Sequence, residues 1–147
     1  MHYNLALISK EPVNTFQISK MLSRFRDDFL YKIIGQSEEE EDDEVCLLSI
    51  ISKEDRVKYF PIDWDWLTIG GRWNNYIDNE CNVKRISKIK NKNIEFHAYF
   101  NALTEEVGAK KAYDGEEFIE NLDYQSSFDK QLEDNQDCYL TILDMHY

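Results

Sequence analysis

Residues 63–75 constrain the fold most, because the three tryptophans of the chain and its single Gly-Gly pair all fall within this stretch. Before the glycines the side chains alternate as in a β-strand and place Trp64, Trp66 and Thr68 on one face. The glycines allow backbone angles that a side chain would forbid, so we expect the chain to turn sharply there. The stretch therefore predicts a strand, a tight turn, and a polar and aromatic segment after the turn.

Arg72 and Trp73 follow the turn, and two interpretations of them are open. In the first, Arg72 pairs with Asp63 or Asp65 while the tryptophans fill the core, which is how these residue types are used most often. In the second, a guanidinium beside an indole at a glycine-rich turn holds a carboxylate or phosphate through paired N–H bonds. The sequence favours the first interpretation and keeps the second as the alternative.

The remaining chain predicts a single α+β domain over residues 1–147. A capping-box pattern at Asn14 and Gln17 begins the clearest helix, which we expect over residues 14–34, with Phe25 on its core face. This order of elements favours a mostly antiparallel sheet with two main helices on one face, and a ferredoxin-like arrangement is one way to connect it. The other apolar patterns predict strands at 2–9, 94–103 (with Phe100 in the core) and 139–147, one broken helix or two short ones at 115–134 and a turn at Gly108. The apolar run at 45–51 fits either a helix or a strand, and its length and paired isoleucines favour a strand.

Charge is the strongest signal in the composition, because the chain has a net charge of −12. An uninterrupted acidic run lies in a predicted loop, residues 36–44, whereas basic side chains gather at 83–93. A negative field repels nucleic acid, so direct nucleic-acid binding is disfavoured and a basic protein partner fits better. Most acidic runs only keep a loop solvated, so partner binding is the alternative to a role in solubility.

The candidates for binding a partner or ligand are the residues around the turn, the start of the basic segment and the acidic run. They are Trp64, Trp66, Arg72, Trp73, Asn74, Asn75, Lys84, Arg85, Glu38, Glu39, Glu40, Glu41, Asp42, Asp43 and Glu44.

Signals for catalysis are weaker. His97 and His146 lie on predicted strands, and Asp144 shares a face with His146, so these three could form a metal site or an acid–base pair if their strands are neighbours. Isolated strand histidines are more often structural, and the sequence has no P-loop, dinucleotide fingerprint, zinc-protease motif or nucleophile elbow. We therefore expect no catalytic residues, no cofactor and no metal centre.

The sequence also predicts a cytoplasmic protein. No apolar run reaches the roughly 18 residues that a membrane span needs, and the first residues lack the basic start and apolar core of a signal peptide. Cys46, Cys81 and Cys138 are odd in number and far apart, which fits free thiols better than disulfides or a zinc site.

The turn resembles an element in small uncharacterised proteins of phages and bacteria, in which Gly-Gly-Arg-Trp is followed by a Phe-His-x-Tyr strand and a C-terminal Asp-x-His. In this chain those segments are residues 66–73, 96–99 and 144–146. The chain departs from the pattern at Met145, where Cys is usual, and at 105–108, where a Gly-Trp turn is usual. The resemblance implies a phage or mobile-element origin and transfers no activity.

Three hypotheses for the function follow. The first is a non-enzymatic, phage-encoded inhibitor, similar to anti-CRISPR proteins, which binds the basic nucleic-acid-binding surface of a host defence effector. The alternative is binding or hydrolysis of a phosphorylated small molecule, such as a nucleotide signal, at the Gly-Gly-Arg-Trp turn, with an indole stacked on its base. The third is a phage assembly or scaffold component that self-associates through the same surface.

Overall fold

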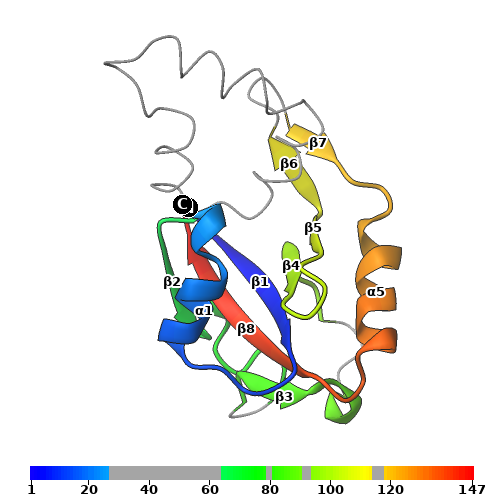
Figure 1. The fold of residues 1–147 in the computed structure, drawn as a ribbon. Helices are drawn as coiled ribbons and strands as arrows, with labels where there is room; N and C mark the ends of the chain where they lie inside the picture. Colours follow the sequence, from blue (N-terminus) through cyan, green and yellow to red (C-terminus); the bar gives the residue numbers. More distant parts are fainter. Residues whose placement is uncertain (27–63, 79–80, 91–93, 114–117) are drawn as a thin grey trace.

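The computed structural model describes residues 1–26, 64–78, 81–90, 94–113 and 118–147. A mixed six-stranded sheet and two α-helices in these residues make an α+β fold (Figure 1). The sheet has the strand order β2-β8-β1-β4-β5, and β3 pairs with β8 outside this path. The strands are β1 (His2–Ser9), β2 (Trp66–Ile69), β3 (Val83–Arg85), β4 (Ala98–Asn101), β5 (Val107–Ala109), β6 (Lys111–Tyr113), β7 (Phe118–Glu120) and β8 (Tyr139–His146), of which β6 and β7 form a separate two-stranded sheet. The α-helices are α1 (Thr15–Met21) and α5 (Tyr124–Asp134).

Strands β1 and β8 form the centre of the sheet. They pair antiparallel along their whole length, from His2 opposite His146 to Ser9 opposite Tyr139. Strand β1 also pairs with β4, in parallel, whereas the other pairs in this sheet are antiparallel. The strands expected at 2–9 and 139–147 are thus confirmed. Because the sheet is mixed, a ferredoxin-like connection stays a prediction.

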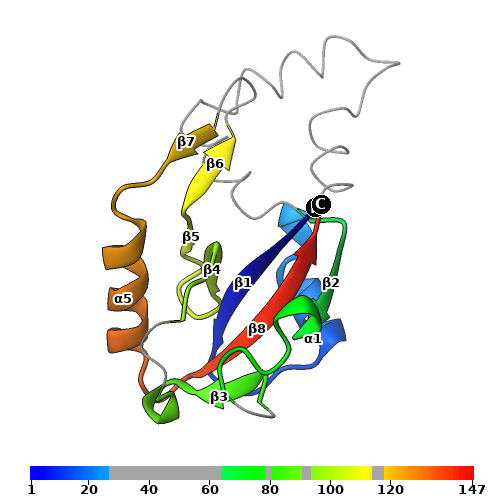
Figure 2. The same ribbon diagram turned by 180° about the vertical axis from the view of Figure 1, so that it is seen from behind.

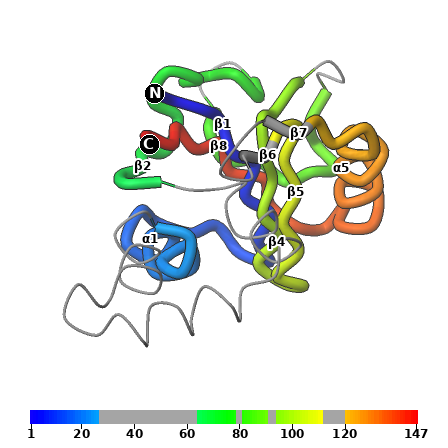
Figure 3. The backbone as a smooth tube through the Cα atoms, turned by 90° about the horizontal axis from the view of Figure 1, so that it is seen from above, coloured from blue at the N-terminus to red at the C-terminus, as the bar shows by residue number. Residues whose placement is uncertain are grey.

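The two helices pack against opposite faces of the sheet, so the expectation of both helices on one face is wrong. Leu5 and Leu7 of β1 pack in one cluster with residues of α1, and Ala6 and Ile8 pack in a second cluster with residues of α5. The physical reason is that β1 is apolar on both faces, and each face must be covered. Figure 3 shows α1 and α5 on different sides of the central strands.

Helix α1 begins as expected and ends early. Asn14 is its N-cap, and the capping box with Gln17 is complete. A helix was expected over residues 14–34, of which 27–34 lie outside the described residues. Helix α1 stops at Met21, because the carbonyl of Leu22 accepts bonds from the Trp64 indole and the Phe25 amide. A continuous α-helix would use that carbonyl for the amide four residues on. A 3-10 turn, η1 (Ser23–Phe25), follows instead.

Two further elements differ from the expectation. Gly108 lies inside β5 rather than in a turn, and a Cβ there would come within 2.3 Å of the Tyr99 ring. In the segment expected as a broken helix, residues 118–120 form strand β7, and α5 begins at Tyr124. The expected strand at 45–51 and the acidic loop at 36–44 lie outside the described residues. No helix of the described residues is long and apolar enough to cross a membrane.

Candidate functional site

Polar and aromatic side chains form two rows across the end of the sheet where the chain termini meet. The first row is Trp66, His146 and His2, which are register partners on β2, β8 and β1. In the second row Asp144 of β8 is the register partner of Thr68 and Asn4. Strand alternation puts both rows on the face that carries Ile142, because Leu143 and Met145 pack in the α1 cluster on the other face. We call His2, Asp65, Trp66, Asp144 and His146 the histidine–aspartate face.

Asp144 is the buried centre of this face. It is 3% exposed, and its Oδ1 lies 2.7 Å from Nδ1 of His2, whose side chain is 14% exposed. Its Oδ2 accepts the backbone N–H of Arg72 at 3.0 Å. A buried carboxylate needs such partners, since an unpaired one costs several kcal/mol. Because a carboxylate only accepts, it holds the His2 proton on Nδ1.

The Gly-Gly pair brings the turn onto Asp144. Gly70 and Gly71 have φ angles of 77° and 53°, and the 3-10 turn η3 (Gly71–Trp73) follows. A Cβ on Gly71 would lie 2.4 Å from Oδ2 of Asp144, so no other residue leaves room for this approach. The turn crosses β8 on the side away from α1 (Figure 2). The sharp turn expected at the glycines is confirmed.

A second histidine–carboxylate pair lies beside the first. Nδ1 of His146 is 2.6 Å from Oδ1 of Asp65, and this pair is more exposed, with 30% and 45% of the two side chains accessible. Desolvation raises the pKa of the Asp65 carboxyl, but the hydrogen bond and charge of His146, with backbone N–H groups, outweigh it and leave the pKa below its usual value. Both histidines therefore use Nδ1 for a carboxylate.

The rings of this face pack against one another. The Trp66 indole stacks on His146, with ring centres 4.9 Å apart and planes 9° from parallel. His2 makes edge contacts with both rings, at 5.3 Å from Trp66 and 4.9 Å from His146. In the described residues neither Nε2 of His2 nor Nε2 of His146 makes a hydrogen bond. These two nitrogens are available to give or take a proton.

His97 is held in the opposite tautomer. Its Nδ1 accepts the backbone N–H of Asn4 at 3.1 Å, so the neutral ring carries its proton on Nε2. Burial lowers the pKa of His97, and the charge of Lys110 lowers it further, while Glu95 raises it. The Trp73 ring contacts the His97 ring edge-on at 5.9 Å.

The expected ion pair between Arg72 and Asp63 or Asp65 is not found in the described residues. Asp65 bonds His146, and Asp63 lies outside the described residues. Over the ranges that the structure describes, the Arg72 guanidinium is exposed and makes no hydrogen bond or ion pair. The backbone N–H of Arg72 donates a hydrogen bond to Asp144. Among the described residues the side chain is thus a cation without a protein partner, on a residue whose backbone contacts the histidine–aspartate face.

The structure separates several sequence candidates from this face. Trp64 is 3% exposed and packs in the α1 cluster, on the opposite side from Trp66, because residue 65 forms a bend and the alternation begins only with β2. Asn74 and Asn75 bond Asn82 and shape the turn.

The basic candidates lie further away along β8. Strand β3 pairs with the beginning of β8, whereas β2 pairs with its end. Lys84 bonds Asp78, and Arg85 donates to the Tyr139 hydroxyl. The acidic candidates Glu38, Glu39, Glu40, Glu41, Asp42, Asp43 and Glu44 lie outside the described residues.

The weak metal candidates His97, Asp144 and His146 do not assemble into a site. Asp144 bonds His2 and Arg72, and His97 bonds Asn4, so each is turned to a different partner. Among the described residues no group of three histidine, cysteine or acidic side chains is placed to hold a metal ion.

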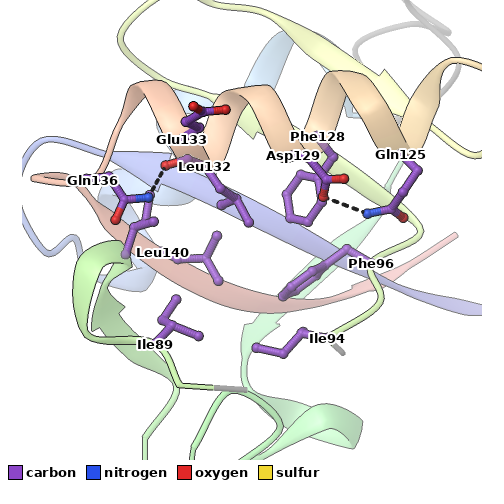
Figure 4. Close-up of a pocket in the computed structure, with 11 residues that line it drawn as sticks. Ile89, Ile94, Phe96, Gln125, Phe128, Asp129, Leu132, Glu133, Gln136 and Leu140 are labelled. Atoms are coloured by element: carbon purple, nitrogen blue, oxygen red, sulfur yellow. Dashed lines mark hydrogen bonds between the residues drawn. The ribbon is translucent and has the colours of Figure 1, made fainter. Parts of the chain in front are cut away.

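A cavity of about 240 Å³ lies elsewhere, between α5 and the segment after the 3-10 turn η4 (Ile86–Lys88) (Figure 4). Its charged residues are Asp129 and Glu133, both exposed on α5, and it has no histidine or arginine. Its lining is otherwise largely apolar and consists of Ile86, Ile89, Ile94, Phe96, Phe128, Leu132 and Leu140, with Gln125 and Gln136. The paired histidine and carboxylate side chains lie on the histidine–aspartate face instead.

The sequence candidates omit two residues of this face, namely Asp65, which was expected only as a partner of Arg72, and His2. The signal was available, since His2 and Asn4 alternate with apolar residues at the start of one strand as Asp144 and His146 do at the end of another. Antiparallel pairing of these two strands brings the pairs together. The chain therefore presents a polar, acid–base face on the exposed end of a central sheet. Comparison with family models, with curated proteins and with solved structures finds no match to this chain.

Proposed function

We propose that the protein binds a phosphorylated small molecule at the histidine–aspartate face and moves a proton on it. The observation that carries this proposal is the pair of adjacent histidines, His2 and His146, that both bond a carboxylate through Nδ1 and, among the described residues, have no hydrogen-bond partner on Nε2. It develops the alternative hypothesis of the sequence, which placed the phosphorylated ligand at the Gly-Gly-Arg-Trp turn, and the contacts of the two histidines support it over a purely structural role for these residues.

The two pairs suit general acid–base chemistry. A carboxylate at Nδ1 fixes the tautomer, so the neutral ring presents a lone pair at Nε2 and the protonated ring presents an N–H there. With two such rings in contact, one can accept a proton from an attacking water while the other gives one to a leaving oxygen. Positioned groups of this kind contribute about 10²–10⁴-fold to a rate.

Arg72 supplies the anion-binding part of the proposal. Its guanidinium is exposed and without a protein partner in the described chain, and its fork of N–H groups matches two phosphate oxygens. The bond from its backbone N–H to Asp144 ties the position of the turn to the buried His2–Asp144 pair. A phosphate held by Arg72 would therefore lie at the edge of the acid–base groups.

The experiment combines binding and turnover. We expect Arg72→Ala to weaken binding of pyrophosphate and sugar phosphates by about 1.5–3 kcal/mol, the range for a hydrogen bond to a charged group. Arg85→Ala removes the same charge at the far end of β8 and serves as the matched control. Calorimetry measures binding, and phosphorus NMR measures release of phosphate. The proposal is wrong if the wild type binds none of these compounds, or if both arginine variants lose binding equally.

The histidine variants test the proton transfer. His2→Gln and His146→Gln should lower turnover by at least tenfold and leave the binding of phosphate compounds largely intact. His97→Gln is the control, because its ring bonds Asn4 instead of a carboxylate. Equal losses in all three variants would contradict a special role for the carboxylate-bound pair.

A second proposal is the inhibitor favoured by the sequence, a phage-encoded, anti-CRISPR-like protein that covers the basic nucleic-acid-binding surface of a host defence effector. The observation that supports it is the net charge of −12, to which α5 contributes the exposed acids Asp129, Glu133 and Asp134. Binding should then fall steeply with salt and survive Arg72→Ala. Failure of the purified protein to block nucleic-acid binding by any such effector would remove this proposal.

A further inference from the structure

Trp66 has one indole face covered by the protein and a large exposed area. The ring stacks on His146 at 4.9 Å, with the planes 9° from parallel, and 44% of the residue stays exposed. Strand β2 is the terminal strand of the path β2-β8-β1-β4-β5, so Trp66 lies on an edge strand of the sheet.

His2 does not cover the open face of the indole. Its ring centre is 5.3 Å from Trp66 and 4.9 Å from His146, and its plane is nearly perpendicular to both. A ring on the outer face of Trp66 would be much further from His146 than from Trp66. His2 therefore lies beside the stack, and among the described residues no aromatic ring packs on the face of Trp66 opposite His146.

We propose that this open face of Trp66 is a stacking platform for a planar base, so that the phosphorylated ligand of the histidine–aspartate face is a nucleotide. The inference rests on the proposed function for the phosphate, which it assigns to Arg72. It adds the base, and it assigns the base to Trp66 rather than to Trp73, the indole next to Arg72. Trp73 is less suited, because it packs against the α5-side core and contacts His97 edge-on.

The chemistry of the platform is independent of base identity. Each base has a π-face, and stacking on an aromatic side chain changes affinity by about 5- to 150-fold. The neighbouring Nε2 atoms of His2 and His146 would lie beside the sugar and phosphate when the base is on Trp66. In this arrangement Trp66 binds the base, Arg72 binds the phosphate, and His2 and His146 exchange a proton with the ligand.

The test compares AMP with ribose 5-phosphate and inorganic phosphate by calorimetry. These probes share the phosphate, and only AMP has a base. We expect AMP to bind at least fivefold more tightly than ribose 5-phosphate, and Trp66→Leu to remove this difference while ribose 5-phosphate binding is retained. Trp73→Leu is the matched control and should keep the preference for AMP.

An NMR measurement on the wild type makes the test independent of variant folding. AMP should shift the indole Nε1–H signal of Trp66 upfield through the ring current of the base, and ribose 5-phosphate should not. Equal binding of AMP and ribose 5-phosphate would overturn the stacking inference and leave the proposed function standing. Binding of neither would overturn both, and loss of the AMP preference in Trp73→Leu alone would move the base to Trp73 and overturn the assignment to Trp66.

Discussion

The substitution Asp144→Asn tests the central element of the candidate site with little change of shape. The backbone N–H of Arg72 can only donate, so the amide oxygen of the new side chain must face it. The NH₂ group then faces Nδ1 of His2, where the carboxylate was. His2 must accept at Nδ1, and its proton moves to Nε2. The variant therefore keeps the packing and reverses the tautomer of one histidine.

The stability cost follows from the two bonds that Asp144 makes. A hydrogen bond to a charged group contributes about 1.5–3 kcal/mol and a neutral one about 0.5–1.5 kcal/mol. Replacing two charge-assisted bonds by two neutral ones in a site that is 3% exposed should cost about 2 kcal/mol. The same change at the exposed pair, Asp65→Asn, should cost under about 1 kcal/mol, since 45% of the Asp65 side chain is accessible.

Urea unfolding measures both costs, and long-range ¹H–¹⁵N spectra at pH 8 report the tautomers. In the wild type we expect His2 and His146 to carry the proton on Nδ1. In Asp144→Asn only His2 should switch to Nε2, with loss of turnover if His2 acts as the base. A wild-type His2 protonated on Nε2, or an Asp144→Asn variant as stable as the wild type, would refute the geometry from which this reasoning starts.

Three further predictions follow from the described contacts. Gly71→Ala should lower the free energy of unfolding by at least about 2 kcal/mol, because a residue with φ of 53° is strained and its Cβ would displace Asp144; denaturant midpoints measure this, and a neutral effect would contradict it. Phe25→Ala and Phe100→Ala should each lower the free energy of unfolding by about 3–5 kcal/mol, because both rings are buried. The double variant should lose less than the sum of the two, because the ring centres are 5.7 Å apart, and additive losses would contradict an energetic coupling between the rings. The pKa of His97 is lowered in the fold from its ordinary value of 6.5, so its contribution to stability is present above that pH and is lost as the pH falls through the folded pKa. Thermal unfolding from pH 7 to 5 should therefore show a steeper loss of stability for the wild type than for His97→Gln, and parallel curves would refute the lowered pKa.

Local patterns predicted much of the framework. The apolar run at 2–9, the capping box at Asn14 and the Gly-Gly turn depend on neighbours in sequence, and each is found where the pattern placed it. The end of α1 was not predictable in this way. It depends on the Trp64 indole, which reaches the Leu22 carbonyl from a distant part of the chain.

The sequence by itself determined that strands 2–9 and 139–147 would form, that the chain would turn at Gly70, and that Arg72 would follow that turn. Only the tertiary structure decided the site, because its contacts are between residues far apart in the chain. The pairing of β1 with β8 places His2 beside His146 and Asp144. The pairing of β2 with β8 places Asp65 next to His146, so Asp65 bonds His146 and not Arg72. The alternation of residues in the sequence predicts on which face of its strand a side chain lies. The register and the order of the strands determine which residues of other strands are its neighbours on that face.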